Sequence, residues 1–342
     1  MVHLYAAISE REKTARFRNA IICRRLPGLP QPPNGWSVSA SQTKTRSGLF
    51  LALGAHIVWG SMPLYLLLVQ SVPPLEFVAW RLVFTLPLCL ALLAALRGWG
   101  ELGAVLRNGR AVLTLFGSAA MVAVNWWLYV WAIHNGHIYA ASLGYYILPL
   151  MMMLLGLVVL GEKLTRRQWA AVALAALGVG ILAAGALTTM WLSVAMAVTF
   201  GIYGLLRKTV AAGPLTGLTV ESLILIPVAL AIVGWYCASP AGPALAQGWG
   251  VALAVAWSGP MTAVPLMMFA AAARRMPYTV IGFLQFSSPT IVFLLGLTVF
   301  GEELRPAQLA CYVLIWAAAA LFTWELLRSR KARTMAEETV AA

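Results

Sequence analysis

The sequence of 342 residues contains no Asp and few charged residues of any kind. Charged side chains make up only 10% of the chain, whereas apolar side chains make up 61%. A folded domain of this composition cannot cover itself with a normal water-facing surface. The lack of charge therefore excludes an ordinary soluble enzyme or soluble binding domain and indicates a protein of the lipid bilayer.

Several motifs that carry chemistry are absent as well. The four Cys residues show no Cys-x-x-Cys spacing, so no disulfide or redox role follows. His56 stands alone and His134 and His137 flank a short loop, so we predict no metal site. The sequence has no Gly-x-x-x-x-Gly-Lys-[Ser/Thr] and no nucleophile with a base or a metal cluster, so ATP drive and enzyme chemistry are not supported. We therefore expect no catalytic residue and no cofactor.

What the sequence does contain is a series of long apolar runs. A hydrocarbon core of about 30 Å requires about 20 mostly apolar residues per helix. Ten such runs predict an all-α integral membrane protein with ten transmembrane helices. They lie near residues 48–69, 74–96, 111–133, 138–160, 169–187, 190–207, 215–237, 249–272, 278–300 and 307–327.

The net charge of +13 could indicate a nucleic-acid partner, but the positions of the basic residues favour another explanation. With the N-terminus inside, 22 of the 24 Lys and Arg residues fall on the cytoplasmic side of the ten spans. Only Arg305 lies outside, and only Arg81 lies within a span. This pattern follows the positive-inside rule. We predict that both termini are cytoplasmic and that nucleic acid is not a partner.

An internal repeat divides the membrane region into two halves. Residues 149–168 recur without a gap 140 residues later as residues 289–308, and ten of the twenty positions are identical. The shared residues include a Pro, two Gly, a Glu and a Gln, which apolar composition alone does not explain. We predict a first five-helix repeat over 48–187, a second over 190–327 and a cytoplasmic C-terminal tail over 328–342.

An odd number of helices per half requires that the second half be inverted in the membrane. The turn at Gly161-Glu162 is then expected on the cytoplasmic side, and its copy at Gly301-Glu302 on the outer side. Inverted repeats of this kind allow two related packings, one open to each side, and they are typical of secondary transporters. The repeat therefore predicts alternating access.

The first 47 residues do not fit this plan. They are basic, contain Pro27, Pro30, Pro32 and Pro33, and lack any apolar run that could span a membrane. We interpret residues 1–47 as a disordered tail, or as the product of a start codon assigned too far upstream. A tail held by its charges against anionic lipid is the less favoured alternative, because the charges are spread out.

Short runs spread from about Thr43 to Arg330 form a distinctive combination. They are Gly48-Leu-Phe-Leu-Ala-Leu-Gly-Ala, Trp59-Gly60, Val72-Pro73, Glu76, Arg81, Asn125-Trp126, Tyr129-Val-Trp-Ala132, Ala141-Ser142-Leu-Gly-Tyr145, Pro149-Leu150, Gly161-Glu162, Tyr203-Gly-Leu-Leu-Arg-Lys208, Glu221, Pro227, Pro265, Gly282-Phe-Leu-Gln285 and Pro289-Thr290. In these runs the chain resembles the RarD branch of the EamA drug/metabolite transporter superfamily. This resemblance implies a ten-helix permease of the inner (plasma) membrane; RarD is commonly labelled a chloramphenicol-sensitivity protein, which does not fix a substrate. Trp80 and Leu148 depart from the family pattern, which usually has His and Asn there, and this affects substrate specificity rather than fold.

Two ionisable residues inside the predicted spans are candidates for function. Arg81 is a candidate for binding an anionic substrate group, because an intramembrane guanidinium usually faces a bundle interior or an aqueous cavity. The alternative is a structural tether to a neighbouring helix. Glu221, with no basic neighbour within one turn, is a candidate proton-coupling residue. The alternative for Glu221 is an ion pair with Arg81, which would be structural.

Three polar residues are candidates for lining a mostly apolar substrate pocket: Asn125, Tyr145 and Gln285. A role in holding neighbouring helices together, without any ligand, explains these three residues equally well. Glu76 is expected near the outer end of its helix, where it reaches water and stabilises the helix N-terminus. The glycines before Glu162 and Glu302 are expected to end their helices in the left-handed conformation, so we interpret Gly-Glu as a helix terminator.

These observations predict a secondary-active permease that moves a small organic solute, a metabolite or a drug-like molecule, with proton exchange as one form of coupling. The alternatives are a membrane scaffold or sensor without transport and, less favoured, an integral-membrane enzyme. The partners we expect are the solute and the lipid bilayer. The sequence does not decide whether the protein forms a homodimer. Neither the substrate, the direction of transport nor the coupling ion follows from the sequence.

Overall fold

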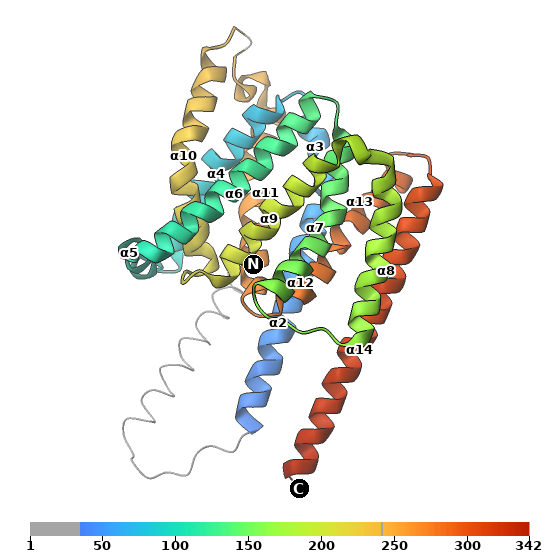
Figure 1. The fold of residues 1–342 in the computed structure, drawn as a ribbon. Coiled ribbons are helices and arrows are strands. Elements are labelled where there is room, and N and C mark those ends of the chain that lie inside the picture. Colours follow the sequence, from blue (N-terminus) through green and yellow to red (C-terminus); the bar gives the residue numbers. More distant parts are fainter. Residues whose placement is uncertain (1–34, 241, 342) are drawn as a thin grey trace, which may run out of the picture.

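The computed structural model describes residues 35–240 and 242–341 as a bundle of long helices (Figure 1). The described residues contain helices and no strand. The first half comprises α2 (Gly35–Gly60), α3 (Met62–Leu66), η1 (Leu67–Val69), α4 (Pro74–Ala95), α5 (Trp99–Arg107), α6 (Gly109–His134), α7 (Ile138–Val158), α8 (Arg166–Ala183) and η2 (Ala184–Thr189). The second comprises α9 (Met190–Thr209), α10 (Pro214–Ala238), η3 (Ala244–Gln247), α11 (Trp249–Ala273), α12 (Tyr278–Gln285), α13 (Ser287–Thr298) and α14 (Pro306–Ala341).

Nine segments of the described chain are long and apolar enough to cross a membrane. The predicted run over 169–187 is not among them, but it is present as α8, which begins with two Arg and a Gln and lies along α14 (Figure 1). The run over 278–300 is interrupted between α12 and α13. The chain is therefore an all-helical, multi-span membrane protein.

The tails differ from the expectation where they are described. Helix α2 begins at Gly35, so residues 35–47 are helical rather than irregular, and residues 1–34 lie outside the described part. Helix α14 continues to Ala341, so the predicted C-terminal tail prolongs the last membrane helix. One short helix, α5, occupies the predicted loop between the second and third spans. The division into two halves at 187–190 stays a prediction.

The two copies of the repeat lie at opposite ends of the bundle. The loop from α7 to α8 carries Gly161 and Glu162 at the lower end in Figure 1, and the loop from α13 to α14 carries Gly301 and Glu302 at the upper end. We call these the Glu162 end and the Glu302 end. Helices α8 and α14, which follow the two loops, run antiparallel beside each other. This is the arrangement expected of inverted repeats.

Local chemistry accounts for several helix boundaries. Pro74 and Pro214 stand in the first turns of α4 and α10, where a missing N–H costs nothing. Thr165 and Gln168 form a capping box at the start of α8. Gly161 and Gly301 both have φ of 65°, which confirms the predicted left-handed termination in each half.

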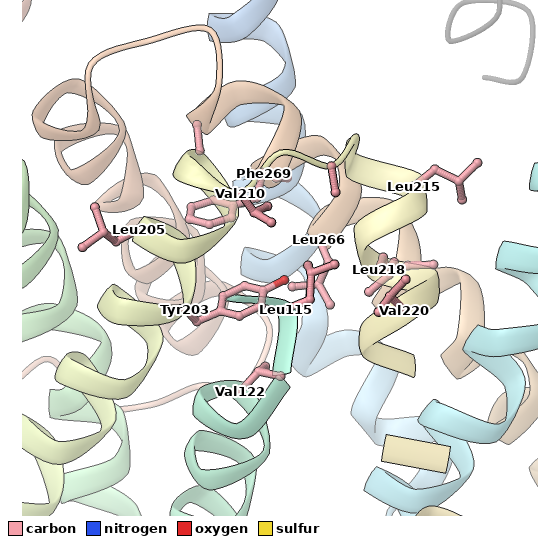
Figure 2. Packing of buried hydrophobic residues seen from close by; sticks show 14 of the residues in the cluster. Leu115, Val122, Tyr203, Leu205, Val210, Leu215, Leu218, Val220, Leu266 and Phe269 are labelled. Carbon is pink, nitrogen blue, oxygen red and sulfur yellow. The ribbon is translucent and has the colours of Figure 1, made fainter. Parts of the chain in front are cut away.

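Helix packing places the core between the two halves. Helix α4 packs against α10 and α11, α9 packs against α6 and α7, and α7 packs against α12. Figure 2 shows the largest buried cluster, in which Tyr203 of α9 points toward Leu115 of α6 and Leu266 of α11. Polar side chains buried within this core therefore lie where helices of both halves meet.

Candidate functional site

Arg81 lies on α4 and reaches a neighbouring helix of the other half. Its Nε donates a 2.9 Å hydrogen bond to Oγ1 of Thr262 on α11. Its guanidinium carbon lies 5.0 Å from the ring centre of Trp126 and 5.8 Å from that of Phe77. No carboxylate of the described residues forms an ion pair with Arg81. The positive charge is thus held by one hydroxyl and aromatic faces, with no anion to balance it.

Three phenols complete the surroundings of this guanidinium. The hydroxyl groups of Tyr65, Tyr129 and Tyr145 all lie within its electrostatic range. Tyr129 and Tyr145 meet edge to face, with ring centres 6.4 Å apart. Tyr145 is 39% exposed and lies within electrostatic reach of Arg81. The structure therefore places Tyr145 near Arg81, and it adds Tyr65 and Tyr129, which were not among the candidate site residues.

Glu221 does not pair with Arg81. Its Oε1 lies 3.7 Å from Nε of Arg207 on α9 and accepts a 2.5 Å hydrogen bond from Oγ of Ser118 on α6. Both charged side chains are almost completely buried. The predicted alternative, an Arg81–Glu221 pair, is wrong because α10 turns Glu221 toward α6 and α9.

Arg207 was counted among the basic residues of the cytoplasmic side, at the end of the predicted span over 190–207, but its side chain does not face water. The side chain is buried at the end of α9, where Nη2 donates a 2.8 Å hydrogen bond to the carbonyl of Pro214. Nε and Nη1 have no hydrogen-bond partner in the described structure. Gly217 leaves the room that the guanidinium occupies, since a Cβ at that position would overlap Nη1. The only sequence signal for this burial was the position of Arg207 within the last turn of a predicted helix.

A small cavity lies beside Glu221. Thr262 and Trp126, which hold Arg81, line it together with Glu221 and Ser222. The cavity volume that the centre of a water molecule can occupy is about 10 Å³. This is enough for about one water molecule. Glu221 therefore lines the cavity itself, whereas Arg81 contacts two of the lining residues, Thr262 and Trp126.

The remaining predicted pocket residues are both buried. Asn125 is 3% exposed, and its Nδ2 donates to the carbonyl of Met196 at 2.8 Å and to Oγ1 of Thr199 at 3.1 Å, both on α9. This amide joins α6 to α9. Gln285 ends α12 and is also 3% exposed, and its Oε1 has no hydrogen-bond partner among the described residues. Asn125 thus has a contact role without any ligand, whereas Gln285 retains a free acceptor.

Glu76 is not the water-accessible side chain that its position suggested. It is 1% exposed, and its Oε1 accepts from Nε1 of Trp80 at 3.0 Å and from the backbone N–H of Ala244 at 2.7 Å. The carboxylate therefore caps η3 of the other half rather than its own helix. Trp80, which departs from the family pattern, supplies one of the two donors.

Comparisons with known proteins match this architecture. The profile of the EamA-like transporter family matches residues 46–184. Protein RarD of Streptomyces exfoliatus is 38% identical over 298 residues, which cover 87% of this chain and 95% of that protein. A transporter of Pseudomonas aeruginosa is 40% identical over 286 residues, covering 83% and 95%. Protein RarD of Escherichia coli is 34% identical over 296 residues, covering 84% and 97%.

The chain belongs to the RarD branch of the EamA transporter family. The resemblance expected from the sequence is thereby confirmed, as is a non-enzymatic role as a membrane transporter. A solved crystal structure shares the fold with a TM-score of 0.65 at 18% identity, covering 82% of this chain and 98% of that chain. At this identity the likeness concerns the fold alone.

Proposed function

We propose that this EamA transporter is a secondary permease that moves a small organic solute across the inner membrane by alternating access, and that Arg81 binds an anionic group of the solute. The observation that carries the proposal is an intramembrane guanidinium with no carboxylate partner among the described residues. Arg81 is half-buried, and a charge within a membrane bundle that has no counter-ion is costly, so a ligand that supplies the anion would be favoured.

The groups around Arg81 restrict the rest of the solute. Trp126 and Phe77 offer apolar faces, and Tyr129 and Tyr145 offer hydroxyl groups next to them. A site of this kind suits a solute with a carboxylate or phosphate and an apolar body. Gln285, with its free acceptor, is a further candidate contact for a donor group.

The test begins with finding the solute. Metabolites of cells and medium are compared between cells that lack the protein and cells that overproduce it, and candidates are then assayed for flux in proteoliposomes. Because one relative is named chloramphenicol-sensitive protein RarD, chloramphenicol belongs in the panel as a neutral compound. We expect anionic solutes to be transported and Arg81→Lys to retain some flux, since it keeps the charge but loses the planar fork.

Matched variants separate recognition from folding. Arg81→Gln should abolish flux of the anionic solute while the purified protein keeps a wild-type melting temperature in detergent. Thr262→Val removes only the hydroxyl that orients Arg81 and should raise the solute concentration needed for half-maximal flux. Flux that survives Arg81→Gln unchanged would contradict the assignment, and absence of any solute-dependent flux would favour a scaffold or sensor.

Coupling to protons is a second part of the proposal, and Glu221 is its candidate residue. The observation in its favour is the one-water cavity beside a buried carboxylate. Glu221→Gln keeps the shape and removes the titrating group. A proton-coupled carrier should then bind its solute yet lose flux driven by a pH gradient. Full pH-driven flux in a stable Glu221→Gln protein would exclude Glu221 as the coupling residue.

A further inference from the structure

The two Gly-Glu turns of the repeat have the same local conformation. The N–H of Glu162 donates to the carbonyl of Gly156 at 3.0 Å, and the N–H of Glu302 donates to that of Gly296 at 2.9 Å. Each carboxylate folds back over its glycine. A Cβ added to Gly156 would lie 2.9 Å from Oε2 of Glu162, and one added to Gly296 would lie 3.0 Å from Oε2 of Glu302. Any difference between the two turns is therefore one of tertiary contact.

At the Glu162 end, the carboxylate holds the first turn of a helix from the other half. Oε1 of Glu162 accepts from the backbone N–H of Tyr278 at 2.6 Å, and Oε2 accepts from that of Thr279 at 2.8 Å. Helix α12 has no cap of its own, because its N-cap residue is Pro277. A carboxylate at a helix N-terminus forms charge-assisted hydrogen bonds and meets the positive end of the helix dipole. Glu162 thereby joins α7 to α12.

At the Glu302 end, the corresponding bonds are absent. The 140-residue offset of the repeat places Ile138 and Tyr139, the first residues of α7, in the positions of Tyr278 and Thr279. The N-cap residue of α7, His137, makes no side-chain capping bond. Glu302 is exposed, and within the described residues its carboxylate accepts no hydrogen bond from α7. The backbone N–H groups of Ile138 and Tyr139 and the carboxylate of Glu302 are therefore at the same end of the bundle but form no hydrogen bond with each other.

Other repeat-related positions show the same asymmetry. Gly282 of α12 is buried against α7, where a Cβ would lie 2.8 Å from the carbonyl of Pro149. Its counterpart on α7, Ser142, is exposed. Gln285 is 3% exposed, whereas its counterpart Tyr145 is 39% exposed. Helix α12 is thus packed against α7 at the Glu162 end, whereas the corresponding positions of α7 are exposed at the Glu302 end.

We infer that Glu162 and Glu302 form an alternating latch, in which each carboxylate caps a helix of the other half in only one of the two transport conformations. In the conformation seen here, Glu162 caps α12. In the opposite one, Glu162 releases Tyr278 and Thr279 while Glu302 accepts from the N–H groups of Ile138 and Tyr139. Contacts made in one state only are what bias a two-state equilibrium. The inference rests on the proposed alternating access and assigns residues to its two end states.

The experiment measures the two ends directly and needs no solute. Spin labels are attached to two Cys pairs in the full chain, with the native Cys residues replaced, and distances are measured by pulsed electron paramagnetic resonance in lipid nanodiscs. The pair Lys163 and Arg275 reports on the Glu162 end. Its repeat counterpart, Glu303 and Asn135, reports on the Glu302 end.

Opposite shifts in two matched variants are the expected result. Glu162→Gln loses one of two charge-assisted acceptors, so the ratio of closed to open at the Glu162 end should fall roughly tenfold. In the molecules that are open at the Glu162 end, the Lys163–Arg275 distance is longer and the Glu303–Asn135 distance is shorter. Glu302→Gln should change the ratio in the other direction, and the double variant should return toward the wild-type distribution because both states lose the same contact.

A backbone variant provides the second test. Thr279→Pro removes one N–H that Glu162 accepts, at a first-turn position where Pro is tolerated. It should shift the distances as Glu162→Gln does, and the two changes should not add. If Glu162→Gln does not survive purification, Thr279→Pro carries the same prediction.

Two results would overturn the latch: distances unmoved by these variants, or shifts in the same direction for Glu162→Gln and Glu302→Gln. Either would leave the proposed transport intact, since flux is measured separately. A loss of flux in Arg81→Gln with normal latch distances would in turn leave both proposals standing. Failure of the latch and failure of the proposed function are therefore distinguishable.

Discussion

Nε of Arg207 and Oε1 of Glu221 lie 3.7 Å apart in the interior of the bundle, where both side chains are almost fully removed from solvent. The pair joins α9 to α10 and is supported by Ser118 of α6 and the carbonyl of Pro214. Breaking a buried pair by removing one partner usually costs about 3–5 kcal/mol, because the other charge stays buried and uncompensated. Removing the charge and the hydrogen-bonding atoms of either partner is therefore expected to lower stability.

The first prediction follows from this pair. Arg207→Met and Glu221→Leu should each lower the melting temperature in detergent strongly. The double variant should be more stable than either single one, with a coupling of about 1–3 kcal/mol. Thermal unfolding of the four proteins measures this cycle. Simple additivity of the two single changes would show that the groups do not interact.

The second prediction concerns the space that Gly217 leaves for Arg207. Gly217→Ala should destabilise the protein by about 1–3 kcal/mol, because the new methyl group overlaps a buried guanidinium that cannot move into solvent. Gly234→Ala on the same helix is the control, since no atom lies within 4 Å of a Cβ at that position. Equal melting temperatures for the two variants would contradict the packing of Arg207 on Gly217.

The third prediction separates a helix contact from a pocket at Asn125. Asn125→Leu removes both donors to α9 and should cost about 1 kcal/mol, which is typical of hydrogen bonds between membrane helices. Asn135→Leu is the matched control, because Asn135 is exposed and its side chain donates to the carbonyl of Trp131, one turn earlier in the chain, rather than to another helix. If Asn125→Leu leaves stability unchanged but weakens solute binding, Asn125 is a pocket residue instead.

The fourth prediction tests the orientation in the membrane. A single Cys at Lys163 should react with an impermeant thiol reagent only from the cytoplasmic side, and one at Glu303 only from outside, with the native Cys residues replaced. Both positions are exposed at opposite ends of the bundle. Labelling of both positions from the same side would contradict the inverted-repeat topology.

The sequence alone predicted the features that depend on local chemistry. The expected span over 74–96 is α4 at Pro74–Ala95, and the span over 215–237 is α10 at Pro214–Ala238. Gly161 and Gly301 end their helices as expected. Hydropathy, proline and glycine act over a few residues, so a linear pattern is sufficient to locate these boundaries.

Only the tertiary structure decided which charges meet. Glu221 pairs with Arg207, which the positive-inside pattern had only counted among the cytoplasmic charges, and Glu76 caps a segment 168 residues away in the chain. Glu162 and Glu302 stand in equivalent sequence positions, yet one caps a helix of the other half and the other is exposed. Partner choice depends on helix rotation and on how the halves are closed against each other. Neither leaves a periodic or compositional trace, because a buried polar contact needs only one side chain from each helix.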